Sequence, residues 1–170
     1  GTIWRWNRPL LQITQTGQLQ VRLEHRSLPA GPTTTDNVAN IALFYGLVSW
    51  LANTLPEADL PEFQQVRRNF YAAARWGLDT PLQWLDGVQA CPADILLEQA
   101  LPASIQALKN IGFDPPEVDY FLQEVLRERI VKRQTGARWQ RDFYERNQRD
   151  SRALMEAYQY QCTQGAVHTW

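Results

Sequence analysis

The first 28 residues alternate between hydrophobic and polar positions in the way that β-strands do. Two segments, TIWRWN (2–7) and QLQVRLEHRSL (18–28), are rich in residues that favour strands. Residues 15–18 between them (Gln-Thr-Gly-Gln) predict a turn. We therefore expect the two segments to form an antiparallel β-hairpin.

The register of this hairpin decides which side chains lie beside Glu24. If the segments pair across residues 15–18, Arg5 and Asn7 fall near Leu28 and Arg26, on the face that carries Glu24. Pro9 lacks a backbone N–H, and we expect it to bulge its strand. A lone hairpin is marginal in water, so it must join more strands or pack against helices.

The remainder of the chain has helical periodicity. Residues 29–36 contain helix breakers followed by helix N-cap candidates. The first helix is apolar on nearly every side, so we expect it to be central. Pro102 is expected to bend or split the third helix. The expected helices cover residues 35–53, 59–77, 93–110, 118–134 and 137–161.

These elements predict an α+β fold, a small antiparallel β-hairpin or sheet followed by a mainly helical bundle. We assign the hairpin to residues 1–33 and the helical region to residues 34–170. The chain starts with Gly1 rather than Met and enters a strand pattern at once. We therefore expect it to be a piece of a longer protein.

Composition narrows the class of protein. The length of 170 residues fits one domain, and a net charge of −1 gives no general attraction to nucleic acid or membrane. Cys91 and Cys162 lie far apart in the sequence, with only His25 and His168 to assist them, which argues against a zinc site and suits the cytoplasm. The apolar run at residues 38–52 is shorter than the roughly 20 residues that a bilayer requires.

Glu24 and Arg26 are the candidates for chemistry on the second strand. Their side chains point the same way, about 7 Å apart along the strand. A carboxylate can bind Mg²⁺ together with substrate phosphates, and the planar guanidinium of arginine fits phosphate oxygens. On pattern alone, a solvated strand on which Arg22, Glu24 and Arg26 alternate in charge is the favoured interpretation.

Two other charged regions have weaker claims to function. Arg67, Arg68 and Arg75 could line a cleft, or they could be solvated or paired with acidic neighbours. Residues 124–156 hold nine Arg or Lys and six Asp or Glu. This mixture of signs is typical of a solvated helical face, so no nucleic acid is expected as a partner.

Several motifs resemble one family in the same order along the chain. They are GTIWRWNRPL, VRLEHRSLPAGPT, NVANIALFYGL, AAARWGLDTPL, TGARWQRDFYER and GAVHTW. The chain resembles the C-terminal part of the glutamate–cysteine ligase and carboxylate–amine ligase family. This resemblance implies a fold related to glutamine synthetase, with the hairpin belonging to the catalytic sheet of the parent enzyme.

The resemblance also implies a reaction and its residues. Members of the family use ATP and Mg²⁺ to activate a glutamate carboxylate as an acyl phosphate, which an amine then attacks. Glu24 matches the metal-binding carboxylate, and Arg26 matches the arginine that contacts the transferred phosphate. Arg5 is the best match to an arginine that points toward the nucleotide phosphates. His25, between Glu24 and Arg26, is expected to face the other side of the strand and to pack there.

One carboxylate is too few for the metal cluster of such an enzyme, so these residues alone are expected to be inactive. The expected partners are the missing N-terminal half of the same protein, glutamate, an amine and a second copy of the fragment, with no membrane involved. The competing hypothesis is a non-catalytic helical interaction module that retains a relic of the ligase hairpin.

Overall fold

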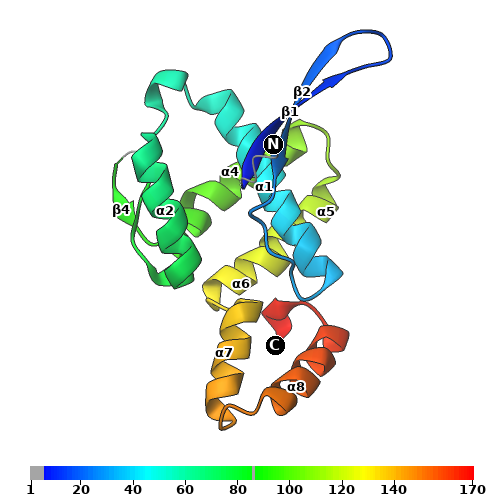
Figure 1. The fold of residues 1–170 in the computed structure, drawn as a ribbon, viewed down its shortest axis with the longest axis vertical. Coiled ribbons are helices and arrows are strands. Elements are labelled where there is room, and N and C mark those ends of the chain that lie inside the picture. Colours follow the sequence, from blue (N-terminus) through cyan, green and yellow to red (C-terminus); the bar gives the residue numbers. More distant parts are fainter. Residues whose placement is uncertain (1–5, 86) are drawn as a thin grey trace, which may run out of the picture. The chain divides into compact units, whose positions relative to one another are not determined.

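The computed structural model describes residues 6–85 and 87–170, and the predicted α+β class is confirmed (Figure 1). The chain divides into two compact units, Gly1–Ala30 and Gly31–Trp170. The second unit thus begins at Gly31, three residues before the expected boundary at residue 34.

The first unit is a hairpin of β1 (Asn7–Ile13) and β2 (Leu19–His25). Its loop is closed by backbone hydrogen bonds from the Thr14 N–H to the Gln18 carbonyl (2.9 Å) and from the Gly17 N–H to the Thr14 carbonyl (3.0 Å). Gly17 has a φ of 79°, which glycine adopts without steric cost. The loop therefore has three residues, 15–17, and ends in a left-handed glycine.

This loop makes the expected register wrong by one residue. Asn7 lies opposite His25 and Arg8 lies opposite Glu24, whereas the sequence had suggested Asn7 near Arg26. The prediction assumed a four-residue turn at 15–18, and the loop has three residues. Because side chains alternate along a strand, a shift of one residue moves every side chain of β1 to the other face.

Pro9 lies within β1 opposite Leu23, in a continuous register without the expected bulge. Hydrogen-bonded and non-hydrogen-bonded pairs alternate along an antiparallel ladder. The bonds at Thr14–Gln18 and Arg26–Trp6 put the Pro9–Leu23 pair in a non-hydrogen-bonded position. The missing N–H therefore faces outward and costs the hairpin no internal hydrogen bond.

The second unit is mainly helical, with one two-stranded sheet. Its longer helices are α1 (Thr34–Thr54), α2 (Phe63–Trp76), α4 (Leu101–Asn110), α7 (Gly136–Arg146) and α8 (Ser151–Gln164). Its shorter elements are η1 (Glu57–Asp59), η2 (Gly77–Asp79), β3 (Leu82–Gln83), β4 (Gln89–Ala90), α3 (Pro92–Ile95), η3 (Leu96–Ala100), α5 (Pro115–Asp119), η4 (Tyr120–Leu126), α6 (Arg127–Val131) and η5 (Val167–Thr169).

The core of this unit lies where α1 packs against α4 and η4. Leu101, Leu122 and Val125 are among its fully buried side chains. Gly46 allows the close approach, because a Cβ atom there would lie 2.5 Å from the Cβ of Ser104. The side of α1 that faces α4 and η4 therefore lies in the core, as the sequence predicted.

The opposite side of α1 is exposed. Val38, Ile41, Tyr45 and Val48 recur every three or four residues and are 36 to 57% exposed. Within the described residues, we find no helix that has both the length and the apolar character to span a membrane.

Helices α3, η3 and α4 follow one another without a break, so Pro102 does not split this segment. The turn before it is a π-helix in which the Leu101 N–H bonds to the Leu96 carbonyl. Such a wide turn accommodates a position that lacks an N–H.

The helix expected at residues 137–161 is wrong, because the structure contains two helices there. α7 ends at Arg146, and Gln148 and Arg149 adopt positive φ values of 54° and 63°. Asp150 then caps α8 by accepting hydrogen bonds from the N–H groups of Arg152 and Ala153. The sequence has no glycine or proline at this break, so periodicity alone continues through it.

Candidate functional site

The candidate site is one face of the hairpin. Strand alternation and the observed register bring four charged side chains to this side, here called the charged face: Arg8, Arg22, Glu24 and Arg26. Arg8 comes from β1, and the other three come from β2 and the residue that follows it.

Glu24 lies between two arginines. Its Oε1 atom is 2.8 Å from Nη2 of Arg26, and its Oε2 atom is 2.6 Å from Nε of Arg8. The Oε2 and Nε atoms are buried and lack hydrogen-bond geometry, so this second contact is a charge contact. The three side chains are about one-third exposed, at 27 to 33%. The site is thus partly shielded and open to a ligand.

The two arginines favour the ionised form of Glu24. The hydrogen bond from Arg26 is the largest cause that lowers the pKa of the Glu24 carboxyl, and partial desolvation opposes it. The charges of Arg26 and Arg8 lower the pKa further. Glu24 is therefore an anion over the whole physiological range of pH.

The charged face fits a phosphate better than an isolated metal ion. Two guanidinium groups within 3 Å of one carboxylate provide planar donors of the kind that bind phosphate oxygens. Oε2 of Glu24 is buried against the Arg8 guanidinium, so a cation could reach it only if this contact opened. Mg²⁺ is commonly held by one or two carboxylates together with substrate phosphates. Both oxygens of Glu24 face arginines in this structure, so Glu24 would become one ligand of such a shared site only after one of these contacts opens.

The rest of a metal site is missing from the described part of the chain. In residues 6–85 and 87–170, no cluster of three or more His, Cys, Asp or Glu side chains is arranged to bind a metal ion. Further ligands would have to come from outside these residues.

The structure brings together two of the three residues that the resemblance singled out. Glu24 and Arg26 are ion-paired on the same face of β2, and Arg5 lies outside the described residues. Sequence reasoning missed Arg8, because the register assumed for the hairpin was one residue off. Gly17 was the available signal, since glycine as the third loop residue marks a three-residue loop.

His25 faces the side of β2 opposite to Glu24, as expected. Its Nδ1 atom lies within hydrogen-bond distance of Oδ1 of Asn7, the residue paired with it on β1. Partial burial lowers the pKa of the imidazole, which favours the neutral form. His25 therefore belongs to the packing of the hairpin rather than to the charged face.

A second cluster of charge lies inside the helical unit. Asp36 is fully buried in the first turn of α1. It accepts hydrogen bonds from the Thr33 hydroxyl (2.7 Å) and the Val167 backbone N–H (3.2 Å). Nη1 of Arg129 lies 3.5 Å away and also donates to Asn40. This cluster joins α1, α6 and η5, and its groups mainly satisfy one another.

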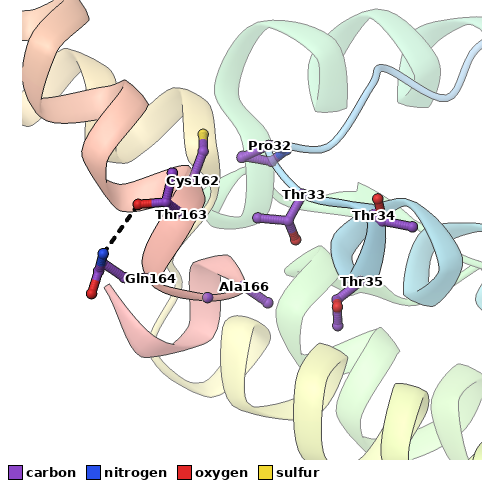
Figure 2. Close-up of a pocket in the computed structure, with 9 residues that line it drawn as sticks. Pro32, Thr33, Thr34, Thr35, Cys162, Thr163, Gln164 and Ala166 are labelled. Atoms are coloured by element: carbon purple, nitrogen blue, oxygen red, sulfur yellow. Dashed lines mark hydrogen bonds between the residues drawn. The ribbon is translucent and has the colours of Figure 1, made fainter.

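A groove of about 450 Å³ lies beside this cluster, between the start of α1 and the end of α8 (Figure 2). Thr163 accepts a hydrogen bond from Gln164 at its rim. None of the residues singled out from the sequence as candidate site residues lines the groove. Its lining consists of Pro32, Thr33, Thr34, Thr35, Cys162, Thr163, Gln164, Gly165 and Ala166.

Arg67, Arg68 and Arg75 lie on α2, in the helical unit. All three are exposed. Arg67 lies 6.0 Å from the ring centre of Tyr71, and Arg75 lies 4.7 Å from that of Trp76. The contacts of Arg67 and Arg75 are with neighbouring aromatic rings, an arrangement typical of a solvated helix surface.

Comparisons with protein-family models, with curated proteins and with solved structures found no match to this chain. Its function is therefore argued from its own residues and from the motifs described above.

Proposed function

We propose that this chain is the C-terminal part of an ATP-dependent carboxylate–amine ligase of the glutamate–cysteine ligase type. The observation that carries the proposal is the Glu24 carboxylate held between Arg8 and Arg26 on one face of a strand. The order of the resembling motifs along the chain supports it, and we infer a cytoplasmic location from the two free cysteines, Cys91 and Cys162.

Arg26 and Arg8 have the same role in this proposal. Each presents a guanidinium group to a transferred phosphate, and Glu24 orients both arginines through its two oxygens. When bound, ATP supplies the phosphoryl group that activates a carboxylate, and Mg²⁺ neutralises part of its charge. Glu24 would bind the metal through Oε2 once Arg8 turns from this oxygen to the phosphate, and Arg5 remains a further predicted phosphate contact. A reaction that relies on positioning and charge needs no protein nucleophile.

The hairpin supplies only one carboxylate toward the metal site that the proposed reaction needs. Glu24 is the only acidic residue in the first 30 positions. We therefore expect these 170 residues alone to be inactive, and the active enzyme to need the N-terminal half of the protein.

The decisive experiment uses the intact protein. Phosphate release from ATP is measured with glutamate and a panel of amines, for the parent protein and for the Glu24→Gln, Arg26→Met and Arg8→Met variants. We expect each variant to lose about a hundredfold or more in kcat, because each lacks a group that stabilises developing charge. Arg22→Met is the matched control, since Arg22 lies on the same face but hydrogen-bonds to Gln20 rather than to Glu24.

The same measurement of phosphate release also tests the competing function. A non-catalytic interaction module predicts no glutamate-dependent phosphate release with any amine. The exposed apolar side of α1 is the observation that favours such a module. Turnover that is unchanged in Glu24→Gln would remove Glu24 from the mechanism.

A further inference from the structure

A small cavity of about 90 Å³ lies within the helical unit, beside Arg129 of α6. Besides Arg129, its lining consists of Gln134, Thr135 and five aliphatic side chains that come from α1, η2, η3, η4 and α6. The aliphatic residues are Leu43, Leu78, Leu96, Leu126 and Ile130. The cavity is therefore mainly apolar, with polar groups at only a few points.

Arg129 carries a hydrogen-bond donor that the described part of the chain does not use. Its side chain is 12% exposed, and its Nε atom is buried without a hydrogen-bond partner in residues 6–85 and 87–170. Nη1 is engaged elsewhere, since it donates to Asn40 and lies 3.5 Å from Asp36. A buried donor without an acceptor is costly, and more so on a charged group. An acceptor that reaches Nε therefore removes this cost.

The other two polar residues of the lining already make hydrogen bonds within the chain. Nε2 of Gln134 donates to the carbonyls of Val167 and Trp170, and the Thr135 hydroxyl accepts from the Arg138 N–H. A buried water needs two to four polar partners, whereas this cavity offers mainly hydrocarbon. A molecule with one acceptor and a hydrocarbon remainder matches the lining better than water does.

The charges around the cavity favour a neutral ligand. Asp36 balances the charge of Arg129, so a second carboxylate would bring an uncompensated negative charge into a buried place. Arg133, which donates to the carbonyl of the lining residue Leu78, is paired with Asp79. Both cations near the cavity thus already have a carboxylate partner.

We infer that this cavity binds a small neutral carbonyl compound, whose oxygen accepts a hydrogen bond from Nε of Arg129 and whose hydrocarbon part contacts the aliphatic lining. By proportion to an apolar cavity of about 150 Å³, which takes benzene, it has room for about four non-hydrogen atoms. The inference does not depend on the proposed ligase function, because it concerns the helical unit and residues that have no part in the charged face.

An NMR titration of the 170-residue chain tests the inference with three probes of four non-hydrogen atoms each. Acetone is neutral and has an acceptor, acetate is an anion of the same shape, and isopropylammonium has no acceptor. We expect acetone to shift the Nε–Hε signal of Arg129 saturably, with a Kd on the order of 1 to 10 mM. Acetate should bind about tenfold more weakly, and isopropylammonium should leave the signal unchanged. No saturable shift with acetone up to about 100 mM, or equal binding of either control probe, would overturn the inference.

Substitutions in the lining show whether acetone binds in the cavity. Leu96→Phe fills the cavity, so we expect it to abolish the acetone shift. Leu97→Phe is the matched control, because Leu97 is also partly buried against the core but does not line the cavity, and acetone binding should be unchanged. Binding that persists in Leu96→Phe, or that is lost equally in both variants, would contradict the inference.

Arg129→Met tests the hydrogen bond itself. The variant lacks the donor, and we expect acetone to bind about tenfold more weakly, measured by the methyl signals of Ile130. Unchanged affinity would exclude Arg129 as the recognition group. If the loss of the pair with Asp36 prevents folding, the comparison of Leu96→Phe with Leu97→Phe still decides the inference.

Discussion

Glu24 of the hairpin and Asp36 of the helical unit are both paired with arginine, in opposite surroundings. Glu24 is about one-third exposed and contacts residues of its own hairpin. Asp36 is completely buried, and its partners Arg129 and Val167 are 93 and 131 positions away in the sequence. The Glu24 carboxylate holds two arginines of its own hairpin at a partly exposed place, whereas the Asp36 carboxylate holds distant segments together.

This difference matters for function. Breaking a buried pair leaves an uncompensated charge inside the protein, while an exposed pair is worth little to stability because water replaces it. A partly exposed cluster that contributes little to stability is free to serve a ligand. Each of the following predictions contrasts the two carboxylates.

The largest effect is expected for Asp36→Ala. The substitution leaves Arg129 buried without its carboxylate and removes the acceptor of the Val167 N–H. We expect unfolding of the helical unit to become easier by about 3 to 5 kcal/mol, measured by urea denaturation followed by helical circular dichroism. Asp119→Ala, which breaks the exposed pair with Lys109, is the control and should cost less than about 1 kcal/mol.

Arg129→Met should have a smaller effect. Asp36 then still accepts hydrogen bonds from Thr33 and Val167, so we expect a loss of about 2 kcal/mol in the same assay. Burial already lowers the pKa of the Arg129 guanidinium, opposed by the charge of Asp36, so this side chain is poorly solvated. A double variant that loses as much as the sum of the single variants would show that the two residues do not act as a pair.

Glu24→Gln should leave the fold intact. Because the pairs with Arg8 and Arg26 are partly exposed to water and lie within the hairpin, we expect no change in the unfolding midpoint of the helical unit. We also expect hydrogen-exchange protection in the hairpin to fall by less than about tenfold. A collapse of hairpin protection would mean that Glu24 is a structural residue, which would weaken its assignment to the candidate site.

The smallest effect concerns the titration of Glu24. Its pKa in the folded chain lies below the usual value of 4.5, so the ion pairs stabilise the hairpin above pH 4.5 and are lost as the pH falls through the lower folded value. An NMR titration of the side-chain carboxyl should show this shift. Arg26→Met should raise the pKa more than Arg8→Met, because the Arg26 hydrogen bond is the largest cause. If the pKa of Glu24 were the same in the parent protein and in both variants, the contacts of Glu24 with Arg26 and Arg8 would be contradicted.

Local patterns were sufficient to predict the elements that depend on neighbouring residues. The alternation in VRLEHR correctly placed Glu24 and Arg26 on one face, since strand side chains repeat every two residues. The apolar segment at 35–53 predicted α1 to within one residue at each end. The predicted class of fold followed from these segments.

Other features required contacts that no local pattern contains. Arg8 reached Glu24 only through the register of the hairpin, which the three-residue loop around Gly17 sets. The break between α7 and α8 depends on two residues in a left-handed conformation, for which the sequence has no glycine.

By itself, the sequence determined the strand alternation, the main helices and the α+β class, because these follow from the spacing of side chains along a short stretch of backbone. Only the tertiary structure decided that Arg8 is the partner of Glu24 and that Asp36 is buried against Arg129 and Val167. Both depend on segments that meet in space, and the geometry of one turn or one helix crossing settles which residues come together.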